Sequence, residues 1–175
     1  MWTEADIPDL SGRIAVVTGA NTGLGFETAR ALAEHGADVV LACRDTDRAA
    51  AAAERIAAGA TRARIDCVPI DLASLGSIRT AAELIRDRYK RLDLLINNAG
   101  VTGLTGATAD GFEIQFGINH LGHFALTGLL LDRLVAAPAA RVVTVSSIGH
   151  RVGRIDPAPP RAPHRNEEGG GGEKS

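Results

Sequence analysis

A glycine-rich turn between an apolar run and an amphipathic segment constrains this chain most. The apolar run Ile14–Val17 predicts a buried strand, and the segment Leu24–His35 predicts a helix. Gly19, Gly23 and Gly25 lie at and just after the junction. A strand that turns sharply into a helix leaves backbone N–H groups unpaired at the positive end of the helix dipole, which favours an anion there. Side chains would keep a pyrophosphate away from that backbone, so glycine is required.

The same alternation continues along the chain. Apolar runs predict further strands at 38–43, 64–70, 92–96 and 141–145, and amphipathic segments predict helices at 45–58, 74–88 and 111–136. Asp45 or Thr46, then Ser74, then Asp110 are the expected caps of these three helices. Strands this apolar are covered on both faces, which predicts a parallel sheet. Right-handed crossovers then give a doubly wound α/β fold with five strands in the order 3-2-1-4-5.

Composition limits the other function classes. The chain of 175 residues fits one domain, which we expect over residues 1–155. Prolines and glycines dominate residues 156–175, which predicts a disordered tail. A net charge of −2 gives no reason to expect a nucleic-acid partner, and no apolar run is long enough to span a membrane. With two well-separated cysteines and no signal peptide, we expect a cytoplasmic protein.

Four motifs follow the predicted strands in order: Thr18-Gly19-x-x-x-Gly23-x-Gly25, Asp71-Leu72, Asn97-Asn98-Ala99-Gly100 and Val145-Ser146-Ser147. Together they resemble the short-chain dehydrogenase/reductase family, whose fold is a Rossmann sheet. The segments 42–44 and 119–124 are similar to its retinol-dehydrogenase-like and protochlorophyllide-reductase-like branch. The resemblance implies hydride transfer between a nicotinamide cofactor and a small-molecule carbonyl or alcohol.

The resemblance also implies roles for particular residues. Asp71 would touch the adenine, and the Asn98–Gly100 segment would pass near the ribose and brace the sheet. Asn119 would hold a water of the proton relay, and Ser147, with Ser146 as the alternative, would bind the substrate carbonyl. The full set expected to bind the cofactor is Gly19, Asn21, Thr22, Gly23, Leu24, Gly25, Arg44, Asp71, Leu72, Asn98, Ala99 and Gly100.

The end of the second predicted strand indicates the choice of cofactor. Folds that select NAD place an acid about 20 residues past the glycines, where it binds the ribose 2′-hydroxyl. Here that position holds Arg44, whose guanidinium suits the 2′-phosphate of NADP. Arg48, one helical turn later, could assist. We therefore expect NADP(H) to be favoured over NAD(H); the alternative is that Arg44 is a solvated loop cation.

The catalytic pair of the family is absent from the sequence. The family uses Tyr-x-x-x-Lys, in which the lysine lowers the pKa of the phenol. The single tyrosine, Tyr89, has Asp93 four residues later, and the segment 89–91 is expected to be a solvated helix end. Two hypotheses remain. The first is an NADP(H)-dependent oxidoreductase by family that is inactive because Tyr-x-x-x-Lys is absent. The second is a non-catalytic dinucleotide-binding remnant or truncated gene product.

Two features of the longest predicted helix, 111–136, complete the expectations. His120 and His123 are three residues apart, but no third ligand is evident, so packing beside the cofactor site is preferred to a metal site. If the sheet ends after five strands, the helix should expose apolar side chains around residues 124–130. That surface predicts self-association through Phe124, Leu126, Leu129 and Leu130.

Overall fold

Five parallel strands form one sheet in the order β3-β2-β1-β4-β5, as predicted. The computed structural model describes residues 3–151 and 153. The expected tail over 156–175 lies outside these residues. The strands are β1 (Ile14–Thr18), β2 (Asp38–Cys43), β3 (Ile65–Pro69), β4 (Leu94–Asn97) and β5 (Arg141–Thr144).

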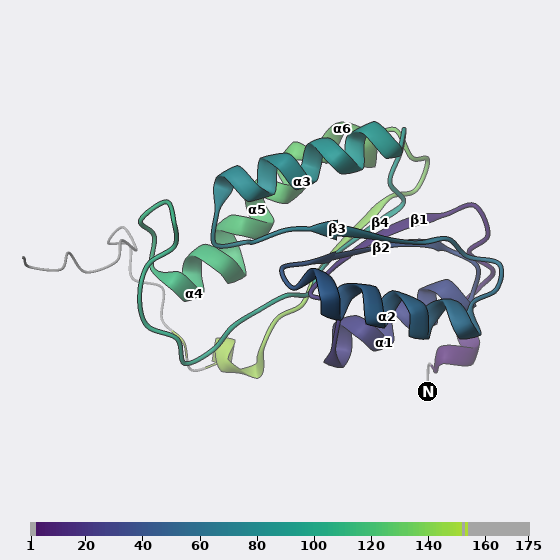
Figure 1. Cartoon of the computed structure of the whole chain (residues 1–175), viewed down its shortest axis with the longest axis horizontal. Coiled ribbons are helices and arrows are strands. Elements are labelled where there is room, and N and C mark those ends of the chain that lie inside the picture. Colours follow the sequence, from purple (N-terminus) through teal and green to yellow (C-terminus); the bar gives the residue numbers. More distant parts are fainter. Residues whose placement is uncertain (1–2, 152, 154–175) are drawn as a thin grey trace, which may run out of the picture.

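Helices cover the sheet on two sides (Figure 1). On one side lie α1 (Gly23–Glu34) and α2 (Thr46–Gly59), and on the other lie α3 (Leu75–Arg88), α5 (His123–Leu129) and α6 (Leu131–Val135). Alternate residues of a strand point to opposite faces. Val16 and Val40 accordingly join one core cluster, while Val17 and Leu41 join the other. Both clusters are fully buried at these strands, which explains why β1 and β2 read as unbroken apolar runs.

The sequence located two helix starts correctly. The Asp45 carboxylate accepts a hydrogen bond from the Arg48 N–H at the start of α2, and the Ser74 hydroxyl accepts one from the Ser77 N–H at the start of α3. Each side chain satisfies one of the free N–H groups of a first turn. Gly36, just past α1, has φ of +96°, a conformation that favours glycine.

The long helix predicted over 111–136 is wrong in its details. It begins later, at α4 (Ile114–Phe116), passes through a π-helical segment, η2 (Gly117–Gly122), and breaks again between α5 and α6. Asp110 does not cap it; the Asp110 carboxylate instead accepts from the Leu75 N–H, and the Glu113 side chain caps α4. Tertiary contacts have displaced the cap that local sequence suggested.

Two predictions of exposure are also wrong. Tyr89 is 3% exposed, because its ring packs in the core while its hydroxyl donates to the Asp66 carboxylate. Leu126 and Leu130 are fully buried rather than exposed, and Leu129 is half-buried. Phe124, 72% exposed, is the one member of the predicted patch that faces solvent.

Polar ties fix the ends of the strands and the first segment of the chain. Asp93, buried just before β4, accepts from the Arg13 guanidinium at 2.9 Å and from the Ile14 N–H at 3.0 Å.

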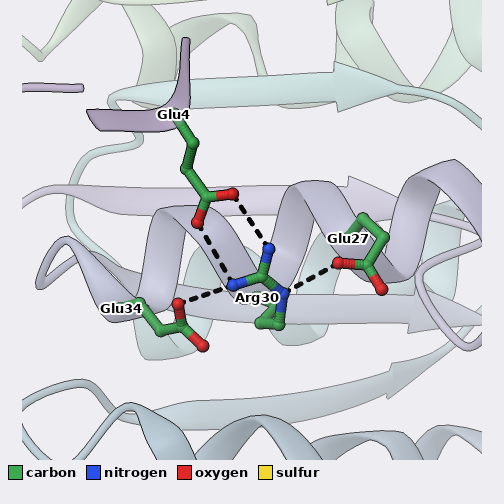
Figure 2. A network of polar contacts seen from close by, with 4 residues as sticks. All are labelled: Glu4, Glu27, Arg30 and Glu34. Atoms are coloured by element: carbon green, nitrogen blue, oxygen red, sulfur yellow. Dashed lines mark hydrogen bonds and ion pairs between the residues drawn. The ribbon is translucent and has the colours of Figure 1, made fainter. Parts of the chain in front are cut away.

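Figure 2 shows Arg30 of α1 contacting three carboxylates. One belongs to Glu4 of the short 3-10 helix η1 (Glu4–Asp6), and the others belong to Glu27 and Glu34. Arg30 therefore ties η1 to α1.

Candidate functional site

The turn from β1 into α1 has the backbone that the glycines predicted. Gly19 and Gly23 have φ of +64° and +57°, which only glycine adopts without strain. A Cβ on Gly25 would overlap the Asn98 side-chain amide and the Gly19 carbonyl. Thr22 precedes α1 in extended conformation, and its side chain accepts no hydrogen bond from the first turn. Backbone N–H groups at the start of this 12-residue helix therefore remain available to an anion.

The loop after β4 is bound to the end of β1. The Asn98 side-chain amide donates to the Thr18 carbonyl at 2.9 Å. The buried Thr18 hydroxyl accepts from the backbone N–H groups of Asn98, at 2.9 Å, and Ala99, at 3.0 Å. These bonds hold the glycine turn and the Asn98–Gly100 segment side by side.

A cavity of about 230 Å³ opens where the carboxyl ends of β1, β2, β3 and β4 meet. Its position is the point at which the strand order reverses, where ligands bind in open α/β sheets. Seven predicted cofactor residues line it: Gly19, Asn21, Arg44, Asp71, Leu72, Ala99 and Gly100. The remaining five, Thr22, Gly23, Leu24, Gly25 and Asn98, build the adjoining turn rather than the cavity wall.

Sequence reasoning missed part of the lining. Ala42, Cys43, Ile70, Val101 and Ile118 contribute to the walls. Ile70 directly precedes the Asp71-Leu72 motif, and Cys43 directly precedes Arg44. Both could therefore have been predicted from the recognised residues beside them. Ile118 is brought in from η2, and no local pattern marked it.

Four charged side chains line the cavity, namely Arg44, Arg48, Asp45 and Asp71. Arg44 is exposed, and among the residues that the structure describes no carboxylate forms an ion pair with it. The Asp45 carboxylate caps α2 and lies 3.3 Å from Arg48 Nε. Asp71 accepts from the Ala73 N–H at 2.9 Å. The only carboxylate next to Arg44 in the sequence is therefore already used by α2.

Asn119, on η2, contacts the loop that follows β4. Its side-chain oxygen accepts from the Val101 N–H and its amide donates to the Val101 carbonyl, both at 2.8 Å. Both polar ends of the side chain therefore hold the loop after β4. The Asn119 carbonyl lies 3.1 Å from Nδ1 of His123, which is 4% exposed. Burial lowers the pKa of His123 below its usual 6.5, with a further contribution from the neighbouring His120.

The two candidate catalytic side chains are not brought together in one cavity. Ser147 and its neighbour Ser146 are exposed, and the Ser147 hydroxyl accepts from the Gly149 N–H at 3.2 Å. Asn119 contributes to a second cavity, of about 280 Å³, between α5 and β5, whose lining does not include Ser147. The roles expected for both residues stay predictions.

Tyr89 lies at the amino end of the sheet, away from the cavity. Its hydroxyl donates to Asp66, the second residue of β3, whereas the cavity is lined by residues that follow β3. The Arg64 guanidinium stacks on its ring at 5.1 Å. Burial and the Asp66 carboxylate raise the pKa of Tyr89 to about 12. Tyr89 is a structural donor at this position.

The described residues contain no cluster of three side chains able to hold a metal ion. None of the helices among them is long and apolar enough to cross a membrane. His123 packs against Thr18 beside the glycine turn, while exposed His120 stacks between Phe116 and Phe124. Both histidines line the second cavity, so they do share a face, but only His123 is buried.

Comparison with known proteins identifies the family. A model of the short chain dehydrogenase family matches residues 13–158. Human retinol dehydrogenase 13 is 48% identical over 155 residues, which cover 88% of this chain and 46% of that protein. An uncharacterised protein of Mycobacterium paratuberculosis has a similar crystal structure, with a TM-score of 0.76 and 49% identity over 89% of this chain and 53% of that one.

A short chain dehydrogenase of Shigella flexneri, crystallised in complex with NADP, is 29% identical with a TM-score of 0.73, covering 89% of this chain and 66% of that one. The chain spans about half the length of the curated relatives it matches. The five-stranded sheet, the glycine turn and these matches agree, and the chain belongs to the short chain dehydrogenase family, in its retinol-dehydrogenase-like branch.

Proposed function

We propose that this chain binds NADP(H) in the cavity at the carboxyl ends of β1–β4. The pyrophosphate would lie on the backbone of the turn formed by Gly19, Gly23 and Gly25. The adenosine end would occupy the space between Arg44 and Asp71. One observation supports the proposal most directly. The start of α1, which has no side-chain cap, lies beside the cavity formed by four strands, at the point where the strand order reverses.

Preference for the phosphorylated cofactor rests on the pair Arg44 and Asp45. A carboxylate that recognises the ribose 2′-hydroxyl of NAD must be free to accept its hydrogen bond. Asp45 is instead engaged by the Arg48 backbone and side chain. Arg44 is exposed at the cavity and can offer the paired donors that match a phosphate. The complex of the Shigella flexneri relative with NADP agrees with this choice.

Measurement of the two dissociation constants tests the preference. A charge-assisted hydrogen bond contributes about 1.5–3 kcal/mol, so NADPH should bind about ten- to a hundredfold more tightly than NADH. Arg44→Asp should abolish or reverse the difference. Arg62→Asp is the matched control, because Arg62 is also exposed but precedes β3 at the other end of the sheet. Equal affinity of the unmutated chain for both cofactors would refute the assignment.

For the family as a whole, the proposed reaction is hydride transfer between nicotinamide and a carbonyl or alcohol. A bound nicotinamide supplies the hydride; the protein must supply the proton and orient the substrate. Ser147 would donate one hydrogen bond to the substrate oxygen, and Asn119 would order the loop through Val101 and support a relay water. The small-molecule substrate itself would bind beside these residues.

The alternative, a chain that binds the dinucleotide without catalysis, is favoured by one observation. The sequence given contains one tyrosine, and its hydroxyl is bound to Asp66 at the end of the sheet opposite the cavity. Loss of a general acid typically costs about 10²–10⁴-fold in rate. We therefore expect this chain alone to oxidise NADPH far more slowly than its relatives with aldehydes, ketones or quinones.

The turnover assay distinguishes the two functions. Saturable NADPH oxidation that survives Tyr89→Phe and disappears in Ser147→Ala would contradict the non-catalytic proposal. NADPH binding without turnover would support it.

A further inference from the structure

The hydroxyl of Thr18 lies at the centre of a buried hydrogen-bond network. It accepts the backbone N–H groups of Asn98 and Ala99 and lies 2.9 Å from Nε2 of His123. A fourth neighbour, the Ile96 carbonyl, is more distant at 3.4 Å. Thr18 itself is completely buried, so water does not compete for these bonds.

Counting donors and acceptors assigns the hydrogens. A hydroxyl has two lone pairs and one hydrogen. The two amides occupy the lone pairs of Thr18, so its hydrogen must point to an acceptor, and His123 Nε2 is nearer than the Ile96 carbonyl. Nε2 therefore accepts, and a neutral imidazole then carries its hydrogen on Nδ1. That nitrogen lies 3.1 Å from the Asn119 carbonyl, which accepts this hydrogen.

The surroundings of His123 favour the neutral ring. From η2, His120 is the titratable neighbour. From α3, Arg79 lies beside Phe124 and Ala125, and on α6 Asp132 is paired with Arg86 and Arg133.

The strands present only uncharged groups towards the cavity that His123 lines, namely Asn97 from β4 and Val142 and Thr144 from β5. Burial, with a contribution from His120, lowers the pKa of His123 despite the opposing hydrogen bond to the Asn119 carbonyl.

We propose that His123 is a positioning residue that links the cofactor turn to η2, and that its protonation weakens dinucleotide binding. The neutral ring bonds Thr18 with one nitrogen and the Asn119 carbonyl with the other. A protonated ring would carry a hydrogen on Nε2 as well and would direct it at the Thr18 oxygen. Both lone pairs of that oxygen already accept the Asn98 and Ala99 N–H groups. Thr18 would then release the Asn98 or the Ala99 N–H, and Ala99 lines the cavity. The effect on affinity rests on the proposed function; the tautomer does not.

The tautomer is tested first, without any ligand. Nitrogen NMR of the labelled chain should show His123 with hydrogen on Nδ1 and none on Nε2 at pH 7.5. As the pH falls below the pKa of His123, exchange of the Asn98 and Ala99 amides should accelerate relative to the general pH trend of other buried amides. A hydrogen on Nε2 at neutral pH, or no relative change at these two amides, would overturn the proposal.

Two variants distinguish the roles of the two ring nitrogens of His123. His123→Asn places a donor near the position of Nδ1, and His123→Gln places an acceptor near that of Nε2. Only His123→Gln should preserve slow exchange at Asn98 and Ala99, now without acceleration at low pH. His120→Gln is the matched control, because His120 is exposed on the same segment and makes no bond to Thr18. It should behave like the unmutated chain.

Affinity for NADPH is then measured against pH. Because a phosphate monoester itself takes up a proton near pH 6, the informative quantity is the difference between the unmutated chain and His123→Gln. Loss of one hydrogen bond corresponds to roughly two- to tenfold, so the unmutated chain should weaken by that additional factor at low pH. Identical pH profiles would overturn the coupling. Failure of every variant to bind NADPH would instead reject the proposed function, with the NMR results still deciding the tautomer.

Discussion

The two edges of the sheet differ in their cover. At one edge, β3 packs between α2 and α3, and Val68 is 1% exposed. At the other, every residue of β5 is exposed, and Val143 is 45% exposed although it is the same residue type as Val68. On the α5 side, a cavity of about 280 Å³ lies between α5 and β5. Burial at an edge is thus set by which helices reach it and not by the apolar character of the strand.

Placing a charge at each edge should give the largest contrast. Val68→Asp would bury an unpaired carboxylate, which is among the few changes that cost more than about 4 kcal/mol. We expect that variant to be unfolded by circular dichroism. Val143→Asp should stay folded and lose under about 1 kcal/mol in urea denaturation, because its side chain already contacts water. Equal losses in the free energy of unfolding for the two variants would contradict the proposed difference between the two edges.

Removal of the Tyr89 hydroxyl should weaken the covered edge by a smaller amount. Tyr89→Phe removes the hydroxyl that donates to Asp66 and leaves that carboxylate with its ion pair to Arg64, a loss of about 1–3 kcal/mol. The folded pKa, about 12, lies above the usual value of 10.0. The stabilisation should therefore be complete below about pH 10 and disappear as the pH rises towards 12.

Urea denaturation of both chains at several pH values checks this prediction. The difference in the free energy of unfolding should shrink above pH 10. A constant difference would mean that the phenol does not act through its bond to Asp66.

Self-association at the uncovered edge should be the smallest effect. Val142, Val143 and nearby Phe124 are exposed apolar side chains. Burying one valine contributes roughly 1.5 kcal/mol, so Val143→Lys should raise the dissociation constant of self-association about tenfold. Thr80→Lys, on the exposed surface of α3, is the control. Sedimentation that shows a monomer for the unmutated chain at high concentration would remove the proposed association.

The sequence predicted the strands well because each contains a short apolar run, and this signal located even β5, whose residues are all exposed. The order of the strands, the glycine turn and the caps Asp45 and Ser74 followed from local rules. The burial of Leu126 and Leu130 was also present in the sequence, since their spacing of one helical turn indicates a common face. We nevertheless expected these leucines to be exposed, because the sheet was predicted to end after the fifth strand and leave that side of the helix uncovered.

The remaining features depend on contacts between distant segments. The π-helical segment brings Gly117 against Thr108 and Gly122 against Leu72, and no periodicity of its own residues shows this packing. The hydrogen bond of buried Tyr89, which follows α3, requires Asp66 from the distant strand β3. At the candidate site, the motifs identified the turn and half of the cavity lining. The engagement of Asn119 by Val101, and of His123 by Thr18, required the fold.

The central place of β1 has a consequence for how the chain assembles during synthesis. Ala15 pairs with Val39 on one side and with Leu94 on the other. The first pairing closes a short loop, whereas the second must wait until β4 has been made and must close a much longer one. We expect β1, β2 and β3 to associate first as the chain leaves the ribosome. The dinucleotide cavity, which needs the loop after β4, would then be among the last parts to form.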